Sequence, residues 1–156
     1  MQKNLTSIVF KLLLGGFELL FVGVLCYMRV MDIGWMLIIF GLLLLPWVLL
    51  HLALMAVFIG SFKISLIDIG LYLAVHFFYL AAWLFQYDGG DSGEVAWVIQ
   101  QIYDSANMTA FLQKWGDNLF YAALAGTIVV YLLIGALLVI RLVRYTRARR
   151  AITTGQ

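Results

Sequence analysis

Cysteine and proline are scarce in this sequence of 156 residues. Its one cysteine, Cys26, excludes an intramolecular disulfide, a CxxC redox pair and a cysteine-based metal site. We expect Cys26 to be a small apolar side chain within a helix. The one proline, Pro46, lies inside an apolar run, where it is expected to kink a helix.

Charge is scarce as well. Only 12% of the residues are charged, whereas 65% belong to the hydrophobic set. Soluble globular chains carry about 25% charged residues. Because a soluble protein of this length cannot bury so much apolar surface, the composition excludes an ordinary soluble enzyme, a disordered chain and a nucleic-acid-binding module. The expected class is an integral membrane protein.

Four apolar runs are long enough to cross a bilayer, which takes about 20 apolar residues. They cover residues 8–28, 33–60, 64–86 and 119–140. Lipid leaves the backbone polar groups of an open strand unpaired, so all four runs are expected to be helices. The predicted fold is all-α: a single transmembrane domain over 1–156, built as a four-helix bundle with short loops.

Basic residues are distributed unequally between the two predicted sides. Only Arg29 and Lys114 lie opposite the termini. The others lie on the side of the termini: Lys3, Lys11, Lys63, Arg141, Arg144, Arg147, Arg149 and Arg150. The positive-inside rule then predicts that both termini are cytoplasmic, and we expect a bacterial inner membrane. The five arginines of the tail, 141–156, are expected to contact lipid headgroups.

The stretch 87–118 is the largest segment outside the predicted spans. After an acidic, glycine-rich start, its apolar residues recur at helical spacing. This pattern predicts an amphipathic helix lying on the outer surface of the bilayer. One interpretation is that the helix covers the end of the bundle, and the other is that it binds a partner. The candidate docking residues are Glu94, Val95, Trp97, Ile99, Ile102 and Tyr103.

Ionisable side chains inside the spans are further candidate sites, because a charge at a helix centre costs about 2.5–3.5 kcal/mol in the membrane. Two of them, Glu18 and Asp68, lie near the predicted cytoplasmic ends of their spans. There a structural ion pair with Lys11, Lys63 or Arg141 is expected, since long basic side chains reach toward the interface.

Two histidines are predicted to reach similar depth on adjacent antiparallel helices, because His51 precedes Lys63 by about as many residues as His76 follows it. Asp68, Tyr72 and His76 lie on one helix face at four-residue spacing. These positions allow three hypotheses. Each histidine bonds a neighbour across the bundle, the polar residues form a proton or ion relay, or the two histidines ligate haem b.

No catalytic constellation is present, and neither HExxH, a P-loop nor GxGxxG occurs. We therefore expect a protein that is not an enzyme and has neither metal nor cofactor. The leading hypothesis is a small subunit of a membrane complex, or a protective or regulatory partner, that acts by protein–protein interaction. Its expected partners are membrane lipids and another membrane or periplasmic protein, or a second copy. The alternative is a small oligomeric carrier or proton-conducting protein that uses Asp68, His76, His51 and Glu18.

Overall fold

The computed structural model describes the backbone of residues 2–31, 35–89 and 95–153, and the side chains of 7–29, 45–86, 97–100 and 102–150. Within this part of the chain the fold is all-α, as predicted, with one short hairpin. The elements in chain order are α1 (Gln2–Met31), α2 (Trp35–Gly60), α3 (Leu66–Leu84), β1 (Tyr87–Gly89), β2 (Val95–Trp97), the 3-10 helix η1 (Val98–Gln101) and α4 (Ala106–Thr153).

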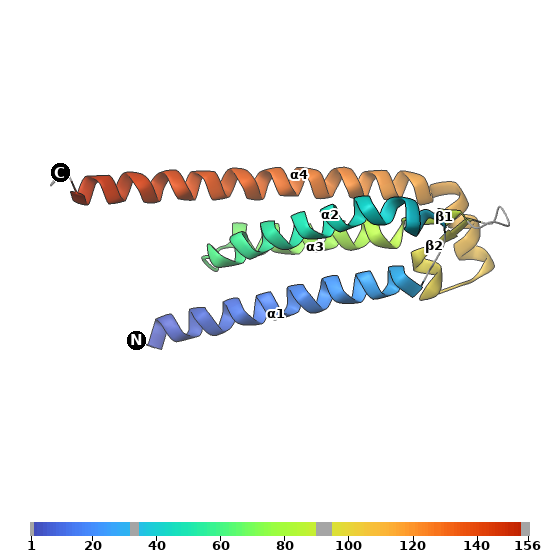
Figure 1. Cartoon of the computed structure of the whole chain (residues 1–156), viewed down its shortest axis with the longest axis horizontal. Coiled ribbons are helices and arrows are strands. Elements are labelled where there is room, and N and C mark those ends of the chain that lie inside the picture. The colour runs from blue at the N-terminus through green and yellow to red at the C-terminus, as the bar shows by residue number, and fades with distance from the viewer. Residues whose placement is uncertain (1, 32–34, 90–94, 154–156) are drawn as a thin grey trace.

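The helices lie along one long axis (Figure 1). Helix α1 begins at the end of the molecule where α4 ends, and the β1–β2 hairpin lies at the opposite end (Figure 1). Among the residues with described side chains, three helices contain stretches long and apolar enough to cross a membrane, namely Ser7–Arg29, Leu66–Leu84 and Ala106–Arg150. The part of α2 with described side chains, Leu45–Gly60, is also apolar.

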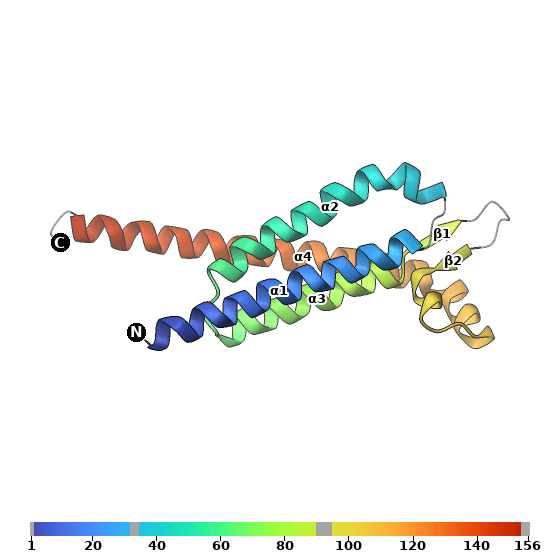
Figure 2. The ribbon, with the colours of Figure 1, turned by 60° about the horizontal axis from the view of Figure 1, so that its bottom comes forward.

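Proline shapes the second helix without ending it. Pro46 lies inside α2. A proline within a helix removes one backbone donor and clashes with the carbonyl of the preceding turn, which bends the helix. The N-terminal half of α2 curves away from the other helices (Figure 2), in agreement with the predicted kink.

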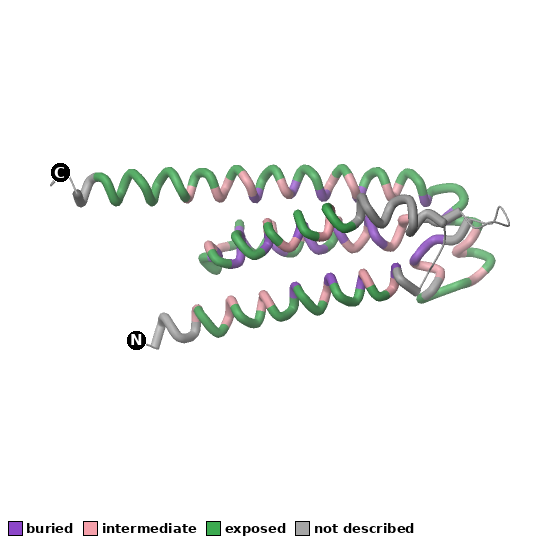
Figure 3. Tube along the Cα trace, viewed as in Figure 1, coloured by how far each residue is buried: buried purple, intermediate pink, exposed green. Residues whose placement is uncertain are grey.

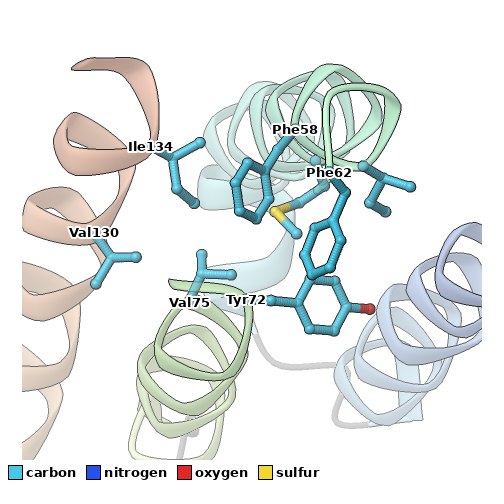
Figure 4. Packing of buried hydrophobic residues seen from close by; sticks show 8 residues of the cluster. Phe58, Phe62, Tyr72, Val75, Val130 and Ile134 are labelled. Atoms are coloured by element: carbon cyan, nitrogen blue, oxygen red, sulfur yellow. The ribbon is translucent and has the colours of Figure 1, made fainter. Parts of the chain in front are cut away.

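The apolar core lies where α2, α3 and α4 meet (Figure 4). Its labelled members are Phe58 and Phe62 from α2, Tyr72 and Val75 from α3, and Val130 and Ile134 from α4. Helix α4 also approaches α3 closely at Gly126, where an added Cβ would overlap the ring of Phe78. A small residue is therefore needed at this helix contact.

Burial follows one stripe along each helix, and the opposite faces are exposed (Figure 3). These exposed faces are also apolar. Leu12, Leu73 and Leu132, for example, are each more than half exposed. A helix that is apolar on its inner and its outer face is typical of a membrane span.

The segment between α3 and α4 corrects a prediction. Where an amphipathic helix was expected, β1 and β2 form an antiparallel hairpin with Tyr87 opposite Trp97, and η1 follows. The backbone N–H of Trp97 donates to the side-chain oxygen of Gln100 at 2.9 Å, and the amide group of Gln100 donates to the hydroxyl of Thr109 at 3.0 Å. These bonds stabilise a tight turn against α4, which helical spacing alone does not reveal.

Helix α4 is much longer than the span predicted at 119–140. The Ser105 hydroxyl accepts the N–H of Met108 at 3.1 Å and so caps the first turn. From there α4 runs for 48 residues, or about 72 Å. Its C-terminal part projects beyond the other helices (Figure 1), so the arginines of the tail lie on a continuous helix.

Candidate functional site

The carboxylate of Glu18, on α1, is buried between two histidines from neighbouring helices. Its Oε1 atom lies 2.6 Å from Nε2 of His51 on α2. Its Oε2 atom is hydrogen-bonded to Nε2 of His76 on α3, at 2.8 Å. Glu18 is only 3% exposed, and a carboxylate so far from water needs charged or donating partners. We call these three side chains the Glu18 cluster.

The second ring nitrogen of His76 indicates how protons are distributed in the Glu18 cluster. This atom, Nδ1, lies 2.7 Å from the backbone oxygen of Tyr72. Because a carbonyl oxygen only accepts, Nδ1 carries a hydrogen. The contact between Nε2 and Glu18 then holds one further proton, either on the imidazole of a charged pair or on the carboxyl group of a neutral pair. One hydrogen therefore lies between the two side chains, bonded to one of them and accepted by the other.

Tyr131 extends the Glu18 cluster to the fourth helix. Its hydroxyl, on α4, lies 2.7 Å from Nδ1 of His51. A tyrosine hydroxyl both donates and accepts, so it satisfies His51 in either tautomer. Tyr131, His51, Glu18 and His76 therefore form a continuous chain of polar contacts with one residue from each helix. Tyr131 is not among the predicted site residues, because its only signal in the sequence is a hydroxyl within an apolar run.

Aromatic rings enclose the two histidines. Tyr79 stacks on His51, with ring centroids 3.9 Å apart and planes 20° apart. Phe21 meets His76 in an edge-on contact, with ring centroids 4.8 Å apart. Such apolar surroundings strengthen the electrostatic interactions within the Glu18 cluster, and they raise the cost of leaving any of its groups unpaired.

A second buried acid, Asp68, lies in the first turn of α3 and has different partners. The backbone N–H of Lys63 donates to its Oδ2 at 2.8 Å, and Arg141 of α4 forms an ion pair with its Oδ1. Arg141 also donates to the backbone oxygen of Ser61 at 2.9 Å. The hydroxyl of Ser65 caps α3 by accepting the N–H of Asp68 at 3.2 Å. These contacts connect the α2–α3 turn to α4.

The two acids therefore differ in how they meet the expected ion pairs. Asp68 pairs with Arg141, one of its expected partners. For Glu18 the expectation of a lysine or arginine partner is wrong, since its ion-pair contacts are with histidines. Lys11 instead donates to the backbone oxygen of Gly60 at 2.6 Å. Its flexible stem reaches the end of α2, while Glu18 lies deeper in the bundle.

The residues of the hypothetical relay fall into two groups. The two histidines lie with ring centroids 6.1 Å apart, and both contact Glu18. Tyr72 offers its backbone oxygen to His76, and its ring lies against the imidazole with centroids 4.2 Å apart. Asp68 precedes His76 on α3 by about two helical turns. It is paired with Arg141 and is therefore separate from the Glu18 cluster.

The geometry gives no support to haem ligation by the histidine pair. Axial ligation uses a free imidazole nitrogen on each side of the iron. Here the Nε2 atoms of His51 and His76 both contact the Glu18 carboxylate, which lies between them. Across the described residues, no group of three or more His, Cys, Asp and Glu side chains is disposed to hold a metal ion.

Some of the predicted docking residues fall outside the described part or are buried. Glu94 lies outside the described residues, and so does the side chain of Val95, whose backbone is in β2. Trp97 is buried, at 5% exposure. Its ring lies so close to Gly116 that an added Cβ there would be 2.6 Å from the indole nitrogen. Trp97 therefore attaches the hairpin to α4 and is not a surface residue.

The other predicted docking residues lie nearer the surface. Ile99 is half-buried, while Ile102 and Tyr103 are exposed. Phe111 and Trp115, from the first turns of α4, are also exposed large side chains. The end of the molecule that carries the hairpin therefore presents exposed apolar and aromatic groups, although not on the predicted amphipathic helix.

The tail arginines occupy two environments. Arg141 is half-buried in its pair with Asp68. Arg144, Arg147, Arg149 and Arg150 are exposed on the projecting part of α4. Arg141 therefore takes part in the packing of the bundle, and the other four arginines lie on its surface.

A groove between α1 and α2 leads to the Glu18 cluster. It has a volume of about 550 Å³, and its lining includes Glu18 and Lys11. Gly15 and Gly16 form part of its wall, and an added Cβ at either position would meet no atom within 4 Å. The two glycines thus leave open space on one side of the buried carboxylate.

The described residues define an all-helical bundle that has a buried carboxylate between two histidines. No known protein family, curated protein or solved structure matches this chain. Its function is therefore inferred from the chemistry of the Glu18 cluster and from the surfaces at the two ends of the bundle.

Proposed function

We propose that this chain crosses a membrane four times and acts as a small proton-conducting protein or proton-coupled carrier. The observation that carries the proposal is the buried carboxylate of Glu18, which lies 2.8 Å from Nε2 of His76 and 2.6 Å from Nε2 of His51. Transfer of a proton between the carboxylate and an imidazole of the cluster breaks no covalent bond between heavy atoms. Titratable groups inside membrane spans are typical of proton pathways.

The depth of His76 supports this function. Helix α3 has 19 residues, or about 28 Å, which is close to the thickness of the hydrocarbon core. His76 is ten residues after Leu66 and eight before Leu84, the two ends of α3. A proton held there is near the middle of the bilayer, where a conducting pathway needs an intermediate site.

Access to the cluster also supports it. The groove between α1 and α2 reaches Glu18 from the side of Lys11. On the α3 side, the hydroxyl of Tyr72 is buried without a hydrogen-bond partner among the described residues, and it points toward α1 (Figure 4). A hydroxyl that both donates and accepts is suited to pass a proton onward. By the positive-inside rule, we place the termini in the cytoplasm and the protein in a bacterial inner membrane.

Proton flux into liposomes tests the proposal. Wild-type protein is expected to dissipate a pH gradient, measured with an enclosed pH-sensitive dye. Glu18→Gln is expected to reduce the flux to that of protein-free vesicles, because the side-chain amide of glutamine does not ionise as a carboxyl group does. Asp104→Asn, a matched change at an exposed acid, is the control and should retain the wild-type flux. Circular dichroism and the elution volume should be unchanged in both variants.

The flux measurement is decisive in both directions. A folded Glu18→Gln variant that conducts as wild type would refute a role of the carboxylate in proton transfer. Wild-type protein that carries no more flux than protein-free vesicles would refute conduction by the protein alone. Glu18→Asp keeps the carboxyl group on a shorter stem, so we expect reduced but measurable flux.

A second candidate function is the binding of another membrane or periplasmic protein, as a subunit or regulatory partner. It is favoured by the exposed set Ile102, Tyr103, Phe111 and Trp115 at the hairpin end, since exposed apolar groups beyond a bilayer are typical of binding surfaces. The test is purification in mild detergent. A stoichiometric partner should be lost with Ile102→Ser and kept with Leu132→Ser, whose side chain lies in the lipid-facing part of α4.

A further inference from the structure

A separate cavity lies at the end of the bundle where the termini are. It has a volume of about 440 Å³ and is open to the surface between the start of α3 and the C-terminal half of α4. Its polar lining consists of Lys63, Ser65, Arg141, Arg144 and Tyr145. We call it the basic pocket. None of its residues belongs to the Glu18 cluster, so a ligand bound there is independent of proton conduction.

The basic pocket has an excess of positive charge. Asp68 is the only acid in the segments 61–86 and 119–156, and it is fully buried in its pair with Arg141. No other acidic residue in these segments therefore neutralises the positive charges of Lys63 and Arg144. The N-terminal end of α3, capped by Ser65, adds the positive end of a helix dipole.

The rest of the lining is apolar. Ile67 and Leu137 form this part of the wall, and Ile67 is 65% exposed on the outside of α3. The cavity lies at Leu66, where the membrane-crossing stretch Leu66–Leu84 begins. A ligand that fits here has an anionic group for the cations and an apolar chain for the outer face of α3.

We propose that the basic pocket binds the phosphate of an anionic phospholipid, with an acyl chain lying along Ile67. Lys63 and Arg144 supply the charge, and Arg141 remains in its pair with Asp68. Arg147, two residues beyond Tyr145, does not line the pocket. A defined site therefore predicts that substitution of Arg144 weakens lipid binding more than substitution of Arg147. A general attraction of basic residues to an anionic leaflet predicts the same loss at both positions.

Lipid binding to the purified full-length chain tests the proposal. Phosphatidylglycerol and phosphatidylcholine are added separately in detergent, and retained lipid is counted by native mass spectrometry. We expect phosphatidylglycerol to be retained and phosphatidylcholine to be lost. Lys63→Gln and Arg144→Gln should each weaken binding about fivefold, while Arg147→Gln, an identical change on the same helix, should weaken it far less.

Each other outcome overturns the proposal. Equal weakening by Arg144→Gln and Arg147→Gln would show a diffuse electrostatic effect. Equal retention of the two lipids would remove the role of the anionic group. Inorganic phosphate that displaces phosphatidylglycerol at a similar concentration would show a phosphate site without an acyl component. Lys63 and Arg144 are exposed, so these variants are expected to fold, and circular dichroism checks this.

Discussion

The two buried acids of this bundle, Glu18 and Asp68, differ in the kind of partner each has. Asp68 is paired with the guanidinium of Arg141 and accepts a backbone N–H, neither of which loses its proton in a protein. Glu18 contacts two imidazoles, whose ring nitrogens either donate or accept a hydrogen bond. Burial is similar at the two sites. The two acids therefore differ in their partners: Asp68 is in a fixed ion pair, whereas Glu18 faces groups that either donate or accept a hydrogen bond.

Their positions agree with this division. Asp68 lies in the first turn of α3, where a negative charge is favoured by the helix dipole. Glu18 contacts His76 at the middle of α3, where no helix end stabilises a charge. Asp68 joins two elements at the edge of the bundle, whereas Glu18 holds α1 to the centre of the bundle.

The largest effect is expected at the fixed pair. Arg141→Leu leaves Asp68 as an uncompensated buried charge, so we expect the free energy of unfolding to fall by about 3–5 kcal/mol. Denaturant titration followed by circular dichroism measures it. Arg147→Leu, on the exposed part of the same helix, is the matched control with little expected change. Equal stability of the two variants would mean that the pair contributes nothing to the fold.

A smaller loss is expected at the Glu18 cluster. Tyr131→Phe removes the hydroxyl that faces Nδ1 of His51, which leaves a buried polar atom unsatisfied at a cost of about 1–3 kcal/mol. Tyr121→Phe, an identical change at an exposed residue of α4, is the control. The same titration compares them. If Tyr131→Phe unfolds like the control, Tyr131 is not part of the polar chain.

The smallest effect concerns the cap that orients Asp68. Ser65→Ala removes the hydroxyl that accepts the N–H of Asp68, and loss of such a cap costs about 1 kcal/mol. Ser61→Ala should cost less, because Arg141 keeps its bond to the backbone oxygen of Ser61. Unfolding midpoints of the two variants provide the measurement. The reverse order would indicate that the Ser61 hydroxyl matters more for Asp68 than the helix cap does.

Much of the helical fold was predictable from apolar runs, since the exposed and the core-facing residues of the helices are both apolar. The histidine partners of Glu18 were not predictable from these runs. Distance along the chain from Lys11 suggested a shallow position, but the lysine stem extends back to Gly60, and the axial offset between helices is set by tertiary packing. Tyr131 has no local feature that separates it from other aromatic residues in the spans.

The outer segment was predicted wrongly for a different reason. Its apolar residues happen to fit a helical period, but the pairing of Tyr87 with Trp97 is a contact between separate stretches of chain. Trp97 is buried because Gly116, further along the sequence, leaves room for its ring. Periodicity within a short window contains no information about such a contact.

The chain of polar contacts with one residue from each helix also has a consequence for biogenesis. If the chain crosses the membrane as proposed, Glu18 enters with the first helix and Tyr131 with the last. Until α2 and α3 are in place, the carboxyl group has neither histidine to bind, and His51 has no hydroxyl until α4 is synthesised. In the proposed bundle, each later helix therefore supplies a partner to a polar group that an earlier helix leaves unpaired.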